Sequence, residues 1–233
     1  IFGCWLAEGH GDVNMTQAMA VSCDIYFYKT IRNCDIDQVY DMFVSFGFGK
    51  KTGIDIPNEV DGLVPNKKYM FNRYGRFGWS KGSLLNIAIG QGELLVTPIQ
   101  VLNYVNLLAT RGSSPVCHFV MTHNLPENVH PELPSNTWAQ IISDMRSVIT
   151  HDKGTGRKAQ PEIKGMKIYG KTGTAENPHG DDHAWFIGWA EYLNEKYSLV
   201  ILLENGGSGG SVAAPLAKII FSQFEFGKNL AFK

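Results

Sequence analysis

A lysine, two threonines and two glycines stand together in the last third of the chain, in the segment Tyr169-Gly170-Lys171-Thr172-Gly173-Thr174. Lysine supplies a positive charge with three N–H donors, and threonine supplies a hydroxyl. Glycine lets a ligand approach the backbone closely, because no Cβ stands in the way. Together these groups suit the binding of a carboxylate and of a developing oxyanion.

Two other interpretations of this segment stay open. Gly165, four residues and Gly170-Lys171-Thr172 match the spacing of a phosphate-binding loop. That loop needs a buried strand before it and a helix that starts at the lysine, whereas Pro178 and several glycines follow here. The second interpretation is an ordinary turn with a solvated lysine. The other Lys-Thr-Gly of the chain, Lys51-Thr52-Gly53, is interpreted as a turn, since no hydroxyl follows its glycine.

Two regions of different character must position these residues. The first, residues 1–150, is mainly helical with loops, because its apolar residues recur at helical spacing. Its longest irregular stretch is residues 57–83, which we expect to be a loop. The expected helices are 16–21, an aromatic-rich helix that starts at Ser22-Cys23-Asp24, 35–44, 98–108 behind the N-cap Thr97, and 135–149. Ser22 and Asp24 by themselves are explained by helix capping.

The second region, residues 151–233, has the pattern of antiparallel strands followed by a C-terminal helix. Three short runs alternate or are rich in β-formers: 166–175, 183–190 and 197–204. Their short connections predict an antiparallel meander, and a helix is expected from Val212 to about Phe224. The chain is therefore predicted to have an α+β fold.

Composition limits the functional classes. With 44% hydrophobic and 18% charged residues, the chain of 233 residues is folded and globular. The net charge of −1 gives no argument for nucleic-acid binding. No apolar run reaches the roughly 18 residues of a membrane helix. Because the chain has no signal peptide and opens on Ile1 rather than methionine, we expect it to be a piece of a longer protein.

A possible metal site lies near the start of the chain. Cys4, His10 and Cys23 form a Cys-x5-His-x12-Cys pattern, and thiolates with imidazole suit zinc, which takes four ligands in a structural site. The fourth ligand would be Asp12, a water or an upstream residue, of which we favour the last. Buried thiols and a Cys4–Cys23 disulfide are the alternatives.

An ordered set of motifs resembles the transpeptidase domain of class B penicillin-binding proteins, in particular their elongation type. Each motif is weak, but together they cover almost the whole chain in one order. They are Gly9-His10-Gly11, Ser22-Cys23-Asp24, Phe46-Gly47-Phe48-Gly49, Thr52-Gly53-Ile54-Asp55, Gly90-Gln91-Gly92, Thr97-Pro98-Ile99-Gln100, Lys171-Thr172-Gly173-Thr174-Ala175, His183-Ala184-Trp185-Phe186 and Glu204-Asn205-Gly206-Gly207.

The resemblance implies a serine transpeptidase or β-lactamase-like fold, whose members cross-link peptidoglycan stem peptides and are acylated by β-lactams. Of its three site motifs, Ser-x-Asn/Asp falls on Ser22 and Asp24, and Lys-Ser/Thr-Gly falls on Lys171 to Gly173. It implies that Ser22 relays a proton, that Lys171 holds the hydrogen-bond network and that Asp24 orients it. Thr172, Gly173 and Thr174 would bind the terminal carboxylate, with the Thr174 N–H as an oxyanion donor.

The remaining motif is Ser-x-x-Lys, and no serine of this chain has a lysine three positions further on. The resemblance therefore places the nucleophile, its helix and the first strands upstream of Ile1. It also implies an inner-membrane anchor, a periplasmic catalytic domain and elongation-complex membrane proteins as partners. A D,D-carboxypeptidase or serine β-lactamase on the same fold, or a non-catalytic cell-wall scaffold, remains an alternative.

Overall fold

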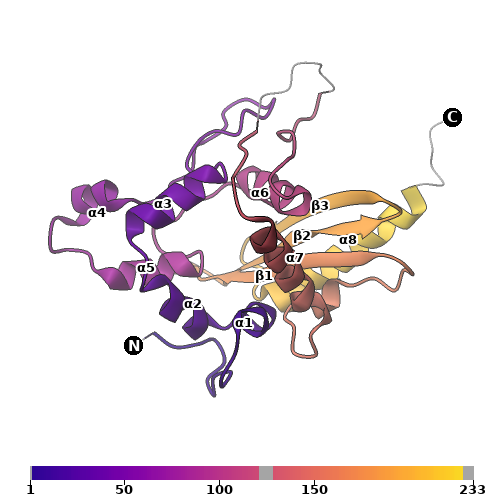
Figure 1. Cartoon of the computed structure of the whole chain (residues 1–233), viewed down its shortest axis with the longest axis horizontal. Helices are drawn as coiled ribbons and strands as arrows, with labels where there is room; N and C mark the ends of the chain where they lie inside the picture. Colours follow the sequence, from indigo (N-terminus) through magenta and orange to yellow (C-terminus); the bar gives the residue numbers. More distant parts are fainter. Residues whose placement is uncertain (1, 121–127, 228–233) are drawn as a thin grey trace. The chain divides into compact units, whose positions relative to one another are not determined.

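The computed structural model describes residues 2–120 and 128–227 (Figure 1). The chain divides into two compact units, one of residues 1–11 and 23–133, the other of residues 12–22 and 134–233. The division differs from the change of composition near residue 150, because the helical segments 12–22 and 134–150 belong with the strands.

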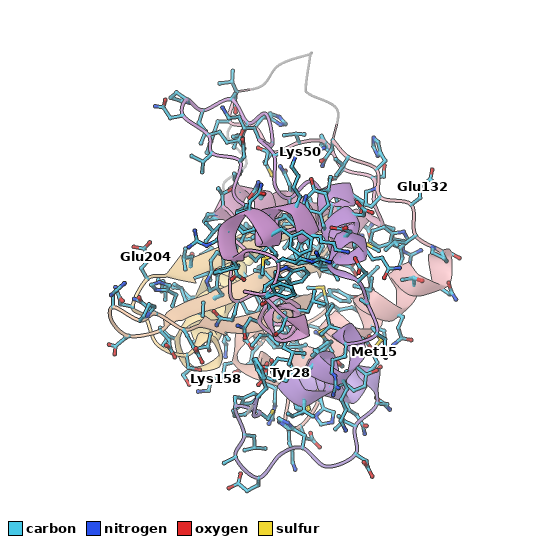
Figure 2. The ribbon with its side chains drawn as sticks, turned by 90° about the vertical axis from the view of Figure 1, so that its left-hand side faces the viewer. Met15, Tyr28, Lys50, Glu132, Lys158 and Glu204 are labelled. Atoms are coloured by element: carbon cyan, nitrogen blue, oxygen red, sulfur yellow. The ribbon has the colours of Figure 1, made fainter. Side chains whose placement is uncertain are left out.

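Three antiparallel strands form the sheet of the second unit in the order β1-β2-β3 (Figure 1). They are β1 (Lys167–Ala175), β2 (His183–Tyr192) and β3 (Glu195–Leu203). Leu193 and Asn194 join β2 to β3 with φ values of 51° and 67°, as a two-residue hairpin turn with two left-handed positions requires. Glu204, labelled in Figure 2, directly follows β3 and is exposed. The predicted meander is confirmed.

Helices cover this sheet. The helix α7 (Ser135–Thr150) packs against β1, and α8 (Ala214–Gly227) packs against β2 after a π-helical start, η2 (Gly209–Ala213). In Figure 1, α7 crosses in front of the strands and α8 passes behind them. A short 3₁₀ helix, η1 (Arg157–Ala159), contacts α8. The core of this unit includes Val148, Ile168, Ala184, Phe186, Ile201, Ala217 and Phe221.

The short helix α1 (Met15–Val21) packs on α7. It begins with a capping box between Asn14 and Gln17, which satisfies two backbone donors at once. The Thr16 hydroxyl donates to Asp144 Oδ1 at 2.6 Å, and Asp144 is fully buried. These contacts fix the start of α1, so its other end, at Ser22, is held by a well-anchored element.

The first unit is helical in its described part. It contains α2 (Asp24–Ile31), α3 (Ile36–Ser45), α4 (Lys67–Tyr74), α5 (Lys81–Ala88) and α6 (Pro98–Thr110). Tyr28, labelled in Figure 2, is the buried residue of α2. The predicted starts of α3 and α6 are confirmed, since Asp35 and Thr97 each form a capping box with the glutamine three residues on. Where structure is described, this unit contains one isolated bridge, Leu63 with Leu95, and no longer strand.

The prediction of one long loop over residues 57–83 is wrong. Helix α4 forms because the Asn66 side chain accepts the Tyr69 N–H at 2.8 Å and because Met70 is fully buried. Met70 packs with Ile36, Leu84 and Ile87 in a small core. The many glycines and aromatics of this stretch give no helical pattern, although tertiary packing stabilises a helix there. Within the described residues, no helix is both long and apolar enough to cross a membrane.

Candidate active site

Ser22 and Lys171, which lie 149 residues apart in the sequence, meet in the structure. The Lys171 ammonium donates to Ser22 Oγ at 2.8 Å and to the backbone carbonyl of Thr172 at 2.9 Å. Both side chains are half-buried. A partly desolvated ammonium on a serine hydroxyl is an arrangement that holds a proton at a defined atom and can pass it on.

Ser22 occupies an unusual backbone position. It ends α1 with φ 55° and ψ 55°, in the left-handed region. This conformation costs a residue with a Cβ roughly 1–2 kcal/mol, and glycine usually occupies it. A serine that persists in a position suited to glycine indicates that the hydroxyl has a use. Ser22 is the C-cap of α1, and its Oγ also accepts from Lys171, so helix capping alone does not account for this side chain.

Strand alternation decides which side chains share a face with Lys171. Side chains of consecutive strand residues point to opposite faces, so Gly173 lies on the Lys171 face, and its cross-strand partner is Trp185. A Cβ at Gly173 would lie 3.2 Å from the Trp185 Cβ. The glycine therefore leaves room for Trp185 on the face that it shares with Lys171.

The two threonines lie on the other face of β1. Thr172 is only 8% exposed, and its hydroxyl donates to Thr155 Oγ1 at 2.6 Å. Thr174 is exposed, and its hydroxyl accepts the Gly209 N–H at 3.2 Å. The predicted contact of both with a substrate carboxylate stays a prediction. Of the two hydroxyls, that of Thr174 is the accessible one.

Asp24 is the first residue of α2, and its Oδ2 accepts the backbone N–H of Trp5 at 3.0 Å. This bond ties the segment before α1 to the start of α2. A carboxylate in a first helical turn also interacts favourably with the helix dipole. The predicted role of Asp24 in orienting the Ser22 network stays a prediction.

The three predicted metal ligands are close together. The ligand atoms of Cys4, His10 and Cys23 all lie within 4.8 Å of one another, and Cys4 Sγ is 3.4 Å from His10 Nδ1. Tetrahedral zinc with bonds of 2.0–2.3 Å places its ligand atoms roughly 3.5–3.8 Å apart, so the cluster is near that geometry. Burial and the neighbouring Cys4 raise the pKa of the Cys23 thiol. Cys4 and Cys23 are free thiols, so they form no disulfide.

The phosphate-loop interpretation is wrong. Lys171 lies in the middle of β1 rather than at the start of a helix, and Gly170 pairs with Gly188 of β2. A phosphate loop uses the free N–H groups at a helix N-terminus, which a strand residue does not offer.

Threonine occurs twice with a lysine three positions on, at Thr150 and Thr155. The Thr150 hydroxyl donates to Arg146 O within its own helix, and Lys153 lies beyond the helix end. Thr155 lies in the following turn and accepts from Thr172. Neither places a hydroxyl and a lysine on one helical face, as a nucleophile with its base requires. Sequence reasoning did not single out Thr155, whose signal is a threonine between two glycines.

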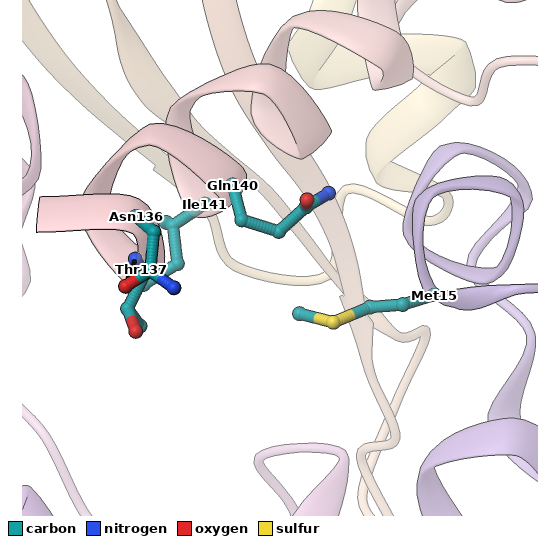
Figure 3. A pocket seen from close by; sticks show the side chains of 5 residues that line it. All are labelled: Met15, Asn136, Thr137, Gln140 and Ile141. Carbon is teal, nitrogen blue, oxygen red and sulfur yellow. Dashed lines mark hydrogen bonds between the residues drawn. The ribbon is translucent and has the colours of Figure 1, made fainter. Parts of the chain in front are cut away.

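A surface pocket of about 350 Å³ lies elsewhere in this unit. Figure 3 shows Met15 of α1 facing Asn136, Thr137, Gln140 and Ile141 of α7 across it. None of the predicted site residues lines this pocket. The pocket and the Ser22–Lys171 pair are therefore separate features of this unit.

The sequence is similar to a known protein family and to curated proteins. Residues 2–222 match the penicillin binding protein transpeptidase domain. The peptidoglycan D,D-transpeptidase MrdA of Haemophilus influenzae is 32% identical over 96% of this chain and 38% of its own length. The chain spans about two fifths of the length of the curated relatives that it matches first.

Solved structures agree. A penicillin-binding protein 2 of Helicobacter pylori, solved in complex with MreC, is similar with a TM-score of 0.86 and 34% identity, over 97% of this chain and 43% of that one. Penicillin-binding protein 2 of Pseudomonas aeruginosa, solved with WCK 5153, has a TM-score of 0.85 and 31% identity, over 95% and 49% of the two chains. The fold is the α+β serine transpeptidase fold, and the chain belongs to the penicillin-binding protein transpeptidase family.

Proposed function

We propose that the protein containing this chain is a serine D,D-transpeptidase that cross-links peptidoglycan stem peptides and binds penicillin. The observation that carries the proposal is the 2.8 Å hydrogen bond from Lys171 to Ser22, which joins β1 to the end of α1. The similarity to enzymes named D,D-transpeptidase supports it.

In the proposed reaction, a serine upstream of this chain gives its hydroxyl proton to an upstream base and attacks the carbonyl carbon between the two terminal D-alanines of a donor peptide. The C–N bond breaks, and the leaving amine needs a proton. Ser22 supplies it through its hydroxyl, which Lys171 replenishes and holds in place. The amine of a second stem peptide then attacks the ester and passes its proton to Ser22 and Lys171, while the departing serine oxygen takes its proton back from the upstream base.

The carboxylate of the departing D-alanine needs recognition. Thr174, exposed beside Gly173, offers a hydroxyl to it, and the Lys171 charge favours an anion nearby. A β-lactam carries a carboxylate next to its strained amide, so the same groups bind it. Labelling by penicillin is therefore the natural assay for this site.

The test uses the full-length protein and a fluorescent penicillin, read by intact mass. We expect one adduct per protein, on a serine outside this chain. A folded protein that gains no adduct would overturn the proposal and favour a non-catalytic scaffold. A D,D-carboxypeptidase or β-lactamase would also be labelled, but would pass the acyl group to water. Product analysis with a donor and an acceptor peptide separates these, because only a transpeptidase forms the cross-linked dimer.

We also propose that Cys4, His10 and Cys23 hold a structural zinc ion. The geometry of their ligand atoms supports this, and a cation offsets the cost of ionising two thiols that lie close together, one of them buried. The fourth ligand among Asp12, a water or an upstream residue stays open. Bound zinc would fix the segment that continues into α2, next in sequence to Ser22.

Elemental analysis of the full-length protein tests the zinc proposal. We expect one zinc per chain, lost in Cys4→Ser together with several degrees of melting temperature, because metal binding contributes to folding stability. Cys34→Ser, which changes a half-buried thiol outside the cluster, is the matched control. A folded protein free of zinc, or a Cys4→Ser variant that keeps it, would remove the proposal.

The H. pylori relative was solved with MreC. By similarity, we propose that the protein containing this chain works at the inner membrane, with its catalytic domain in the periplasm and with elongation-complex membrane proteins as partners. Co-purification of MreC with the full-length protein from its own host tests this. Its absence from the purified protein under conditions that retain the cell-elongation complex would argue against it.

A further inference from the structure

Thr155 lies in a tight turn that the end of α7 fixes. Its neighbours Gly154 and Gly156 donate backbone N–H groups to His151 O at 2.8 Å and Val148 O at 3.1 Å. A Cβ at Gly154 would lie 2.3 Å from Val148 O, and one at Gly156 would lie 2.8 Å from Ile149 Cδ1. Neither glycine accepts a side chain without displacement of its surroundings, so the turn is rigid and Thr155 is held at a defined place.

From this turn Thr155 reaches two other elements. Its backbone N–H donates to Ala20 O in α1 at 3.0 Å, and its hydroxyl accepts from the Thr172 hydroxyl in β1 at 2.6 Å. On a third side, a Cβ at Gly210 would lie 2.9 Å from Thr155 O, so η2 packs closely there. Thr155 thus connects the helix that ends at Ser22 with the strand that carries Lys171.

These contacts form a closed ring. Ala20 lies two residues before Ser22, Ser22 accepts from Lys171 at 2.8 Å, and Lys171 donates to Thr172 O at 2.9 Å. The Thr172 hydroxyl returns to Thr155 at 2.6 Å. Because Thr172 is 8% exposed, breaking the last bond would leave a nearly buried hydroxyl without its partner and free the strand to shift.

We propose that Thr155 is a positioning residue for the Ser22–Lys171 pair, an inference that rests on the proposed function. Its hydroxyl fixes the rotamer of Thr172 and, with it, the carbonyl that receives Lys171. Its backbone fixes α1, and hence the hydroxyl of Ser22. A proton relay depends on distances held to a few tenths of an ångström, and a misplacement of about 1 Å costs on the order of 10²-fold in rate.

The test compares Thr155→Val, which keeps the shape and loses the hydroxyl, with Thr155→Ser, which keeps it. In the full-length protein, penicillin acylation is measured against concentration, so that the acylation rate constant separates from the affinity of the non-covalent complex. We expect Thr155→Val to lower the rate constant by on the order of 10- to 100-fold, with affinity changed less than about twofold. Thr155→Ser should stay within about threefold of the parent.

Thr150→Val is the matched control, because the Thr150 hydroxyl donates to the carbonyl of Arg146 in its own helix at 3.1 Å and not to the Ser22–Lys171 pair. Thr172→Val removes the donor of the same hydrogen bond. This variant tests the proposal if Thr155→Val does not fold. It should lower the rate constant as Thr155→Val does, and the double variant should lose no more than either alone.

The outcomes separate the two proposals. A parent protein that is not acylated overturns the proposed function and this inference with it. A parent that is acylated, with valine variants equal to it, overturns the inference alone. A loss confined to affinity would also overturn the inference, because it would give Thr155 a role in binding. A Thr155→Ser variant as slow as Thr155→Val would overturn it too, because the hydroxyl would then not be what matters.

Discussion

The tripeptide Lys-Thr-Gly occurs twice in this chain, once at 51–53 in an irregular segment of the first unit and once at 171–173 in β1 of the second. In the first, the Glu59 carboxylate accepts from Thr52 N at 2.7 Å, from Thr52 Oγ1 at 2.5 Å and from Gly53 N at 3.0 Å. In the second, the lysine donates to Ser22, and Gly173 pairs with Trp185 of β2.

The comparison shows what the tripeptide provides. Threonine and glycine supply a hydroxyl and two N–H groups that suit a carboxylate, and the first copy holds one from its own chain. Burial pushes the pKa of Glu59 up, but the bonds from Thr52 and Gly53, with the charge of Lys51, outweigh it and lower the pKa. The two copies differ in secondary structure. Residues 171–173 lie in a strand, where the lysine and the threonine point to opposite faces, whereas residues 51–53 are irregular.

Removing each lysine gives the largest expected contrast. Lys171→Ala should lower penicillin acylation of the full-length protein by on the order of 10²–10³-fold, as the loss of a positioned donor does. Lys51→Ala, the same change in the other copy, should leave acylation within about twofold. Rates measured under one set of conditions check both. Equal effects of the two changes would contradict the distinction between the copies.

Ser22→Gly removes the hydroxyl that accepts the hydrogen bond from Lys171. The lysine of the second Lys-Thr-Gly would then lack its serine contact. We expect acylation to fall by on the order of 10²-fold, the usual contribution of a proton-transfer group. Stability should rise by up to about 1 kcal/mol, because glycine adopts the left-handed conformation of this position without strain. Acylation rates and chemical unfolding measure the two effects. Stability that falls along with activity would show that the serine has a structural role.

Glu59→Gln removes the internal carboxylate of the first copy. We expect it to destabilise the protein by about 1–2 kcal/mol at pH 7, the contribution of charge-assisted hydrogen bonds, without an effect on acylation. Because the pKa of Glu59 is lower in the folded than in the unfolded state, its stabilisation is full above the unfolded value of about 4.3 and is lost as the pH falls through the folded value.

Unfolding of Glu59→Gln and its parent between pH 3 and 7 checks this prediction. The difference between the two should shrink towards pH 3. Asp61→Gln, two residues further on, is a control, because the structure assigns the Asp61 side chain no contact with the tripeptide. A difference that stays constant over this range would mean that the Glu59 charge is not what binds Thr52 and Gly53.

Sequence alone predicted what depends on local pattern. Alternation in β1 to β3 and the polar residues at Asp35 and Thr97 were sufficient for the strands and two helix starts. The Ser22–Lys171 pair was predicted only through the resemblance to penicillin-binding proteins. Helix α4 was missed because it depends on burial of Met70 among residues distant in sequence. The contacts of Thr155 and the bond of Asp24 to Trp5 were missed for the same reason, because they join residues whose spacing in the sequence follows no helical or strand pattern.

Helix α1 has only seven residues, too few to form by itself in water. Its helicity depends on the capping box at Asn14, on the hydrogen bond of Thr16 to Asp144 and on the bond of Ala20 to Thr155. The position of Ser22 therefore depends on contacts that neighbouring elements make with both ends of α1. In hydrogen-exchange terms, the amides of Ala18 to Ser22 should exchange as one cooperative group with those of α7. Their exchange would then report how often Ser22 leaves its place beside Lys171.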